Sequence, residues 1–195
     1  MREQITNIFD NNSRLQKQFL EENLDVIISI TAAIVDAVNR GNKVLFFGNG
    51  GSAADAQHLA AEFINRFRID RRALPAVALT TDTSVLTSIA NDSGYDRVFA
   101  RQIEALGLEA DVAVGLSTSG ASPNVIEGLL AARRQGLVTI AFSGGAGGHL
   151  RQKVDHCLLV SSTDTPRVQE MHILAGHAIC ELVEKAVDGA SRTPS

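Results

Sequence analysis

Cysteine is scarce in this chain of 195 residues, which contains two thiols, Cys157 and Cys180, and no C-x-x-C pair. This usage excludes a disulfide framework and a thiolate zinc cage. Long clusters of lysine and arginine are also missing, and 18 basic residues against 22 acidic ones give a formal net charge of −4. Nonspecific nucleic-acid binding needs a positive surface that displaces counterions, so the sequence argues against a nucleic-acid partner.

Long apolar runs are missing as well. The most apolar early stretch, residues 26–38, is interrupted by Asp36 and falls short of the roughly 20 residues that span a bilayer. Residues 1–10 show no apolar segment followed by a small-residue cleavage site, so we expect no secretory signal. These features predict a soluble, cytoplasmic protein with no membrane partner.

The composition that remains is that of a globular protein, with 45% hydrophobic and 21% charged residues. One domain is the expectation for this length. Such a chain can bury roughly 70% of the surface that its unfolded form exposes, so it can build a core without disulfides or metal staples.

The first part of the chain predicts a helix. Apolar residues recur at helical spacing from about residue 12 to residue 39, and Gly41 follows as a stop signal. The pattern indicates a long amphipathic helix or a helix pair, with an apolar face wide enough to suggest an oligomer. We therefore expect residues 1–40 to form a helical oligomerisation segment and residues 41–190 to form the main domain.

After Gly41, short apolar runs alternate with loops of small residues and with helical patterns. The expected strands are residues 44–47, 76–79, 112–116, 138–142 and 157–160. A helix is expected after each of three loops: from the loop at 48–52 to about residue 67, a short one after 80–84, and one from the loop at 117–122 to residue 134. A last helix is expected from residue 167 to about residue 187. This alternation predicts a parallel sheet covered on both faces, and right-handed crossovers make it a doubly wound, five-stranded α/β sandwich. Residues 189–195 are expected to fray.

Two loops at the carboxyl ends of expected strands are candidate ligand sites. Residues 117–122 contain four hydroxyl side chains and a glycine, and Ser122 and Pro123 suit the start of the next helix. Main-chain amides, a helix dipole and hydroxyls together form a phosphate site on a neutral scaffold. The alternative is that serine and glycine only build a turn here.

The other loop, residues 48–52, is also compatible with an anion. It fits the loose dinucleotide pattern G-x-G-x-x-A, but the acidic residue expected about 20 positions on is Asp70, which precedes the second strand instead of ending it. The nucleotide interpretation is weakened, though it stays open. The chain contains no G-x-x-x-x-G-K-[ST], so a P-loop is excluded.

Two expected helices carry further candidates. In the first, Ser52 and Asp55 have the spacing of a capping box, and His58 and Glu62 lie four positions apart on one face, where they could share a metal ion or a substrate. The alternative is an ordinary solvent-facing pair. In the last helix, the eight positions between Gln169 and His177 bring them to one face within about 80°.

The last helix also has a structural interpretation. A polar pair such as Gln169 and His177 on a mostly apolar helix is more often a satisfied core pair than a ligand set. Glu170 and His172 are expected to be structural or to lie at an interface. We expect the two remaining histidines, His149 and His156, at the surface.

Taken in order, the motifs are GNGGS at 48–52, ADAQH ending at His58, Glu62, AND at 90–92, STSG-x-S at 117–122, and RVQE-x-H at 167–172 with His177. They resemble the phosphoheptose isomerase branch of the sugar-isomerase (SIS) domain family over almost the whole chain. The resemblance implies a flavodoxin-like three-layer SIS domain at residues 41–190. It also implies a homotetrameric cytoplasmic enzyme that converts D-sedoheptulose 7-phosphate to D-glycero-D-manno-heptose 7-phosphate, the first step towards the heptose of bacterial surface polysaccharide.

The resemblance implies one zinc ion per subunit, held by His58, Glu62, Gln169 and His177, and sites that neighbouring subunits complete. For the enediol chemistry of such an enzyme we assign Glu62 as the base and His177 as the acid. The implied substrate contacts are Asn49, Gly50, Gly51, Ser52, Glu62, Asn91, Asp92, Ser117, Thr118, Ser119, Ser122 and Gln169.

A second branch of the same fold offers an alternative function. Residues 64–67, residues 79–82 and Met171 are similar to a non-catalytic tetramer that binds the bacterial replication initiator. That branch typically lacks the acid at Glu62 and the histidine at His177, so their presence favours the enzyme. Residues 161–166 depart from some enzyme members, so Asp164 and Thr165 are assigned no role.

Overall fold

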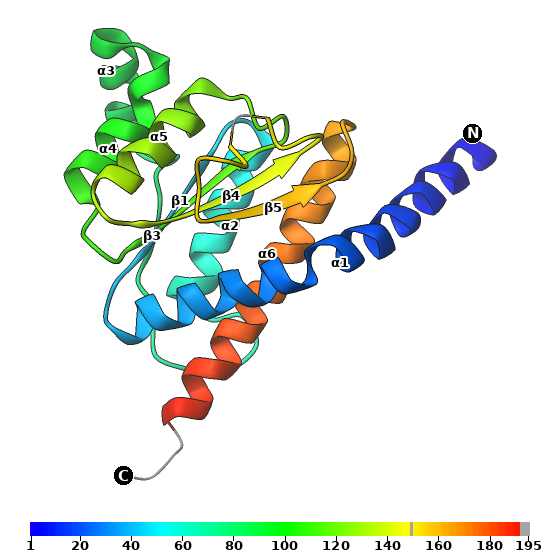
Figure 1. The fold of residues 1–195 in the computed structure, drawn as a ribbon, viewed down its shortest axis with the longest axis horizontal. Helices are drawn as coiled ribbons and strands as arrows, with labels where there is room; N and C mark the ends of the chain where they lie inside the picture. The colour runs from blue at the N-terminus through cyan, green and yellow to red at the C-terminus, as the bar shows by residue number, and fades with distance from the viewer. Residues whose placement is uncertain (149, 192–195) are drawn as a thin grey trace.

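The computed structural model describes residues 1–148 and 150–191 (Figure 1). Its elements, in chain order, are α1 (Arg2–Asn39), β1 (Val44–Gly48), α2 (Gly51–Ile64), β2 (Ala76–Ala78), α3 (Thr83–Ser93), the 3-10 helix η1 (Tyr95–Arg97), α4 (Val98–Leu106), β3 (Val112–Ser117), α5 (Pro123–Arg134), β4 (Val138–Gly144), β5 (His156–Val160) and α6 (Thr165–Ser191). All the predicted strands are confirmed to within two residues. Helix α4 was not predicted.

The five strands form one sheet in the order β2-β1-β3-β4-β5, and every neighbouring pair is parallel. The predicted doubly wound sheet is therefore confirmed. From β1 the chain crosses to β2 on one side, and it later returns to β3 on the other side. The loops after β1 and β3 thus leave adjacent strand ends, where Gly48 pairs with Leu116. Such a switch point is where open α/β sheets bind ligands.

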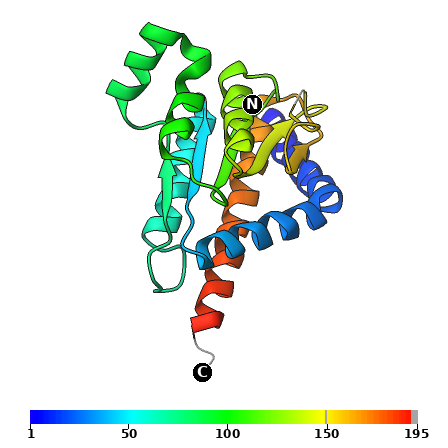
Figure 2. The same ribbon diagram turned by 60° about the vertical axis from the view of Figure 1, so that its left-hand side comes forward.

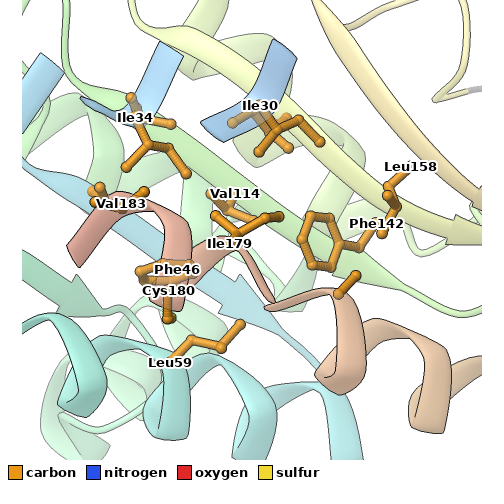
Figure 3. Packing of buried hydrophobic residues seen from close by; sticks show 14 of the residues in the cluster. Ile30, Ile34, Phe46, Leu59, Val114, Phe142, Leu158, Ile179, Cys180 and Val183 are labelled. Atoms are coloured by element: carbon orange, nitrogen blue, oxygen red, sulfur yellow. The ribbon is translucent and has the colours of Figure 1, made fainter. Parts of the chain in front are cut away.

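Side chains that alternate along the strands build two apolar cores. Phe46 joins the core on the side of α1, α2 and α6, which also contains Ile34 and Ile179 (Figure 3). Phe47 points to the opposite face and packs with Phe99 of α4 and residues of α5. The predicted three-layer sandwich follows from this alternation, and the two ribbon views show helices on both sides of the sheet (Figures 1 and 2).

The opening helix is single and begins at Arg2, earlier than predicted. Asn23 on α1 accepts a hydrogen bond from the main-chain N–H of Leu159 and donates one to its carbonyl, at 3.0 and 2.9 Å. The helix therefore covers the edge strand β5. Residues 1–10 are exposed, and this end of α1 projects beyond the sheet (Figure 1).

The last helix extends to Ser191, past its predicted end. Of the segment expected to fray, residues 189–191 are helical, whereas residues 192–195 lie outside the described residues, as does His149. In the described part of the chain, each helix lacks the combination of length and apolarity that crossing a membrane requires.

Candidate active site

Three ligand-type side chains from two helices meet at one point. His58 and Glu62 come from α2, and His177 comes from α6. Nε2 of His58 lies 3.2 Å from Oε1 of Glu62 and 3.0 Å from Nε2 of His177. One ligand atom from each residue lies within 4.8 Å of the others. The predicted pair on α2 thus meets a histidine 119 positions further along the chain.

Small residues let the two helices approach closely. A Cβ atom added to Gly176 would lie 2.6 Å from a methyl carbon of Leu59, so a larger residue beside His177 would force the buried Leu59 side chain to shift. At the start of α2, a Cβ atom on Gly51 would lie 2.5 Å from Nε2 of Gln169. Gln169, the fourth predicted ligand, therefore packs its amide against Gly51.

The donor set fits a zinc ion. Zinc binds two imidazole nitrogens and a carboxylate readily, and Zn–N bonds of 2.0–2.1 Å imply about 3.3–3.4 Å between ligand atoms at the corners of a tetrahedron. The distances of 3.0 and 3.2 Å around Nε2 of His58 are close to this spacing. Two facing ring nitrogens also need a proton or a cation between them, since both cannot present lone pairs to each other.

The start of α2 corrects one sequence prediction. The helix begins at Gly51, and Gly50, with φ of +55°, is the N-cap. Ser52 lies inside the first turn and is buried, so the capping box of Ser52 and Asp55 is wrong. Oδ2 of Asp55 is instead buried without a hydrogen-bond partner among the described residues. Burial raises the pKa of Asp55 against the opposing effect of His58 and His177.

A cavity of about 290 Å³ opens at the carboxyl ends of β3 and β4. Its lining consists of small and hydroxyl residues, namely Thr118, Ser119, Gly144, Gly145, Ala146, Gly148, Thr163 and Thr165. The predicted hydroxyl loop thus contributes two lining residues. Ser117 is buried, and its hydroxyl lies 2.9 Å from that of Ser122. Ser122 is the N-cap of α5 and Pro123 follows it, as predicted, but the Ser122 side chain makes no capping bond in the described structure.

Glycines let the loop after β3 and the loop after β4 pack tightly against each other beside this cavity, and we call this contact the interlock. Gly120 has φ of +65°, and a Cβ atom there would lie 2.5 Å from Oγ of Ser143 and 2.6 Å from the main-chain oxygen of Gly147. A Cβ atom on Gly144 would lie 2.4 Å from the main-chain oxygen of Thr118. Only residues without a side chain allow these backbones to pack so closely.

The remaining predicted contacts lie elsewhere. The amides of Asn49 and Asn124 donate to each other at 2.8 Å in both directions, and the hydroxyl of Tyr95 lies 3.2 Å from Oδ1 of Asn49. Asn91 donates to Asp92 at 2.8 Å on α3, where every described residue is exposed or half-buried. The predicted site residues thus fall into a helix-borne cluster, a loop-borne cavity, the loop after β1 and an exposed pair.

Residues 8–144 match the family model described as the SIS domain. The phosphoheptose isomerase of Roseiflexus sp. (strain RS-1) is 52% identical over 173 residues, which cover 89% of this chain and 88% of that protein. The phosphoheptose isomerase of Aquifex aeolicus (strain VF5) is 50% identical over 187 residues, or 96% of this chain and 98% of that protein. The structure of phosphoheptose isomerase GmhA from Neisseria gonorrhoeae superimposes with a TM-score of 0.89 at 40% identity, covering 94% of this chain and 98% of that one.

The chain belongs to the phosphoheptose isomerase branch of the SIS domain family. Both the resemblance in the motifs and the predicted SIS fold are therefore confirmed.

In this SIS-domain chain, the other histidine of α6 is structural, as expected. His172 is fully buried, with Nε2 3.1 Å from the main-chain oxygen of Ser143. Burial lowers the pKa of His172 to about 4, so the ring is neutral at pH 7 and donates this hydrogen bond through Nε2. The carboxylate of Glu170 accepts hydrogen bonds from the side chains of Arg167 and Asn12. His156 is half-buried on β5.

Sequence reasoning missed one wall of the cavity, which consists of residues 144–146, Gly148, Thr163 and Thr165. The available signal was the glycine-rich run SGGAGG at 143–148, which directly follows an expected strand in this SIS domain. The hydrogen bonds that Asn124 and Tyr95 make to Asn49 carried no local signal, because these residues lie 75 and 46 positions away from it.

Proposed function

We propose that the chain isomerises D-sedoheptulose 7-phosphate to D-glycero-D-manno-heptose 7-phosphate, the first step in making the heptose of bacterial surface polysaccharide. Family membership supports the class of reaction, since relatives named phosphoheptose isomerase are about half identical over nearly the whole chain. The single observation that carries the chemistry is the meeting of Glu62 with His58 and His177, within 4.8 Å.

The cavity beside β3 and β4 is the proposed anchor for the phosphate group. Thr118 and Ser119 offer hydroxyl donors, and the glycines offer main-chain amides. Thr165, the first residue of α6, also lines the cavity, so the positive end of that helix dipole faces the phosphate. Ser117 and Ser122, whose hydroxyls are hydrogen-bonded to each other, are the remaining hydroxyl residues that we assign to the phosphate loop. The sugar chain is assigned to Asn49, Gly50, Gly51, Ser52, Asn91 and Asp92, with Glu62 and Gln169 at the reacting end.

Glu62 and His177 are proposed to move the protons. The carboxylate of Glu62 removes a proton from C1 of the ketose while His177 protonates the carbonyl oxygen at C2, so that a C1–C2 double bond forms. Loss of the C1 hydroxyl proton and return of a proton to C2 then give the aldose. Each correctly positioned acid or base is typically worth roughly 10²- to 10⁴-fold in rate.

The ion proposed for this site is one Zn²⁺ per subunit, held by His58, Glu62, Gln169 and His177. Its coordination is proposed to be loose, or to switch when substrate binds, which would leave Glu62 and His177 able to move protons. When bound, it would supply a Lewis acid that polarises the carbonyl and hydroxyl oxygens and stabilises the enediolate. The tetrahedral spacing around Nε2 of His58 supports this assignment.

A homotetramer is proposed as the assembly, with residues 1–40 as the oligomerisation segment and residues 41–190 as the isomerase domain. Leu20, Leu24 and Ile28 follow each other at four-residue spacing on α1, and each is more than half exposed. Side chains four positions apart lie on neighbouring turns of one helix face, so these three could pack against an apolar face of another subunit. Neighbouring subunits are proposed to complete each active site, and the enzyme is proposed to act in the cytoplasm.

The direct test is to incubate the full chain with sedoheptulose 7-phosphate, with and without a chelator, and to observe the sugar by NMR. Aldose formation that stops on chelation and resumes when Zn²⁺ is returned is the expected result. A protein loaded with Zn²⁺ that makes no aldose but binds a replication initiator tightly would instead favour the non-catalytic alternative suggested by residues 64–67.

A further inference from the structure

A buried ion pair joins the segment after α2 to α6. The side chains of Arg71 and Glu184 are 4% and 1% exposed, and Nε of Arg71 lies 3.4 Å from Oε1 of Glu184. Removing two charges from water is costly, so a buried ion pair is weak evidence of added stability, and we ask instead which geometry it fixes. The hydrogen bonds that Glu184 and Arg71 each make to the main chain answer this.

Glu184 holds the backbone of residues 67–69. Its carboxylate accepts the main-chain N–H groups of Phe67, Arg68 and Ile69 at 2.9, 2.7 and 2.9 Å. Burial by itself would raise the pKa of Glu184, but these three donors and Arg71 outweigh burial and hold the pKa below its usual range. The carboxylate is therefore charged at neutral pH and binds the segment to α6.

Arg71 holds the last turn of α2. Its guanidinium donates to the main-chain oxygens of Glu62 and Phe63 at 2.8 and 2.9 Å. The turn of α2 that carries the Glu62 side chain is thus tied to Glu184, which lies seven positions after His177 on α6. Seven residues are close to two helical turns, so His177 and Glu184 share one face of α6.

Phe67 links the ion pair to the cluster. Its ring is stacked on the imidazole of His177, with ring centroids 5.4 Å apart and planes inclined by 30°. The residue whose N–H group Glu184 accepts therefore also limits how the His177 ring can turn. In that orientation Nε2 of His177 lies 3.0 Å from Nε2 of His58.

We propose that Arg71 and Glu184 are positioning residues, which act through Phe67 and the last turn of α2 to hold His177 and Glu62 in a geometry that binds a divalent metal ion. The inference deepens the proposed function, since it concerns the same cluster. Its test uses metal binding, which does not depend on turnover.

The experiment measures the affinity and visible spectrum of Co²⁺ on the full-length protein, alongside thermal unfolding. Glu184→Gln keeps the size of the side chain but removes its charge, and we expect Co²⁺ affinity to fall 10- to 100-fold, as is usual for residues that support metal ligands. Phe67→Leu keeps the ion pair and an apolar side chain, so it should fold, and we expect about a tenfold loss of affinity with a shifted absorption band. In both variants kcat should fall more than KM changes.

Two controls separate positioning from stability. Glu181→Gln removes a carboxylate from the same helix that pairs with Arg68 and Lys185 at the surface, and it should leave Co²⁺ affinity within about twofold. Ile103→Val trims the core on the opposite face of the sheet, so it should lower the unfolding temperature without changing affinity.

Wild-type affinity and spectrum in Phe67→Leu, or in a destabilised Glu184→Gln, would overturn the proposal. A wild-type chain that binds no Co²⁺ would also overturn it, whereas failure of the isomerase proposal would appear separately, as wild-type protein that binds Co²⁺ but forms no aldose.

Discussion

The helix-borne cluster and the loop-borne cavity are built by opposite means. The cluster takes ionisable side chains, His58, Glu62 and His177, from within two packed helices, α2 and α6. The cavity takes hydroxyls and bare backbone from loops at strand ends. Groups that transfer protons need fixed side-chain geometry, which packed helices supply, whereas a phosphate can be held by main-chain amides that need only the right chain path.

Helix α6 contributes to both regions and supports each with a buried group. Its first residue, Thr165, lines the cavity, and His172 holds the carbonyl of Ser143, where β4 leads into the glycine loop. Further along, His177 belongs to the cluster, and Glu184 binds the segment that carries Phe67. Substitutions in the two regions are therefore expected to change different kinetic constants.

The largest effect is expected from Glu62→Gln in the cluster. The amide cannot accept the proton from C1, so kcat should fall by roughly 10²- to 10⁴-fold while the unfolding temperature stays close to wild type. The measurement is NMR of aldose formation, together with thermal unfolding. Glu109→Gln changes an exposed acid outside the site and is the control. Turnover near the wild-type rate in Glu62→Gln would remove Glu62 from the mechanism.

Gly120→Ala tests the interlocked loops of the cavity. The new Cβ would clash with Ser143 and Gly147 at positive φ, so we expect a loss of about 3 kcal/mol in unfolding free energy and a KM raised by more than about tenfold. Gly41→Ala is the matched control, because Gly41 also has positive φ but faces open space, and it should cost only about 1–2 kcal/mol. Denaturant unfolding and initial rates measure both. Equal losses in the two variants would show that the interlock contributes nothing.

The lowered pKa of His172, which holds the Ser143 carbonyl beside the cavity, predicts how the free energy of unfolding changes with pH. Its folded pKa of about 4 lies below its ordinary value of 6.5, so between these values the unfolded chain binds a proton that the folded chain refuses. Stability from this group is full above pH 6.5 and is lost as pH falls towards 4, by about 2 kcal/mol between pH 7 and pH 5.

Urea unfolding at pH 7 and pH 5 measures this loss. His172→Gln should be less stable at pH 7 but should lose about 2 kcal/mol less than wild type on acidification. An unchanged dependence in His172→Gln would mean that another group titrates.

The sequence predicted what depends on local pattern. Apolar runs gave the strands, and the parallel sheet that they imply placed the loops at 48–52 and 117–122 at carboxyl ends of strands. The structure added that these two strands are neighbours. The helix spacing of His58 and Glu62 was also visible. Contacts across more than a hundred positions, such as Phe67 with Glu184, leave no local trace because tertiary packing decides them. The capping box failed for a related reason, since Gly50 at positive φ starts the helix before Ser52 can cap it.

Ser119→Ala is expected to have the smallest effect, and it gives the most sensitive test of whether the cavity binds substrate without taking part in the reaction. Ser119 is exposed, lines the cavity and accepts the N–H of Ala121 at 3.2 Å, so its hydroxyl proton is free to bond phosphate. Loss of one such bond should cost about 1 kcal/mol, seen as a KM raised by about five- to tenfold with kcat within about twofold. Ser161→Ala, which removes a hydroxyl bonded to Glu22, is the control and should change neither constant. A fall in kcat at constant KM would show that the cavity acts on the reacting groups, and the separation between holding and reacting would fail.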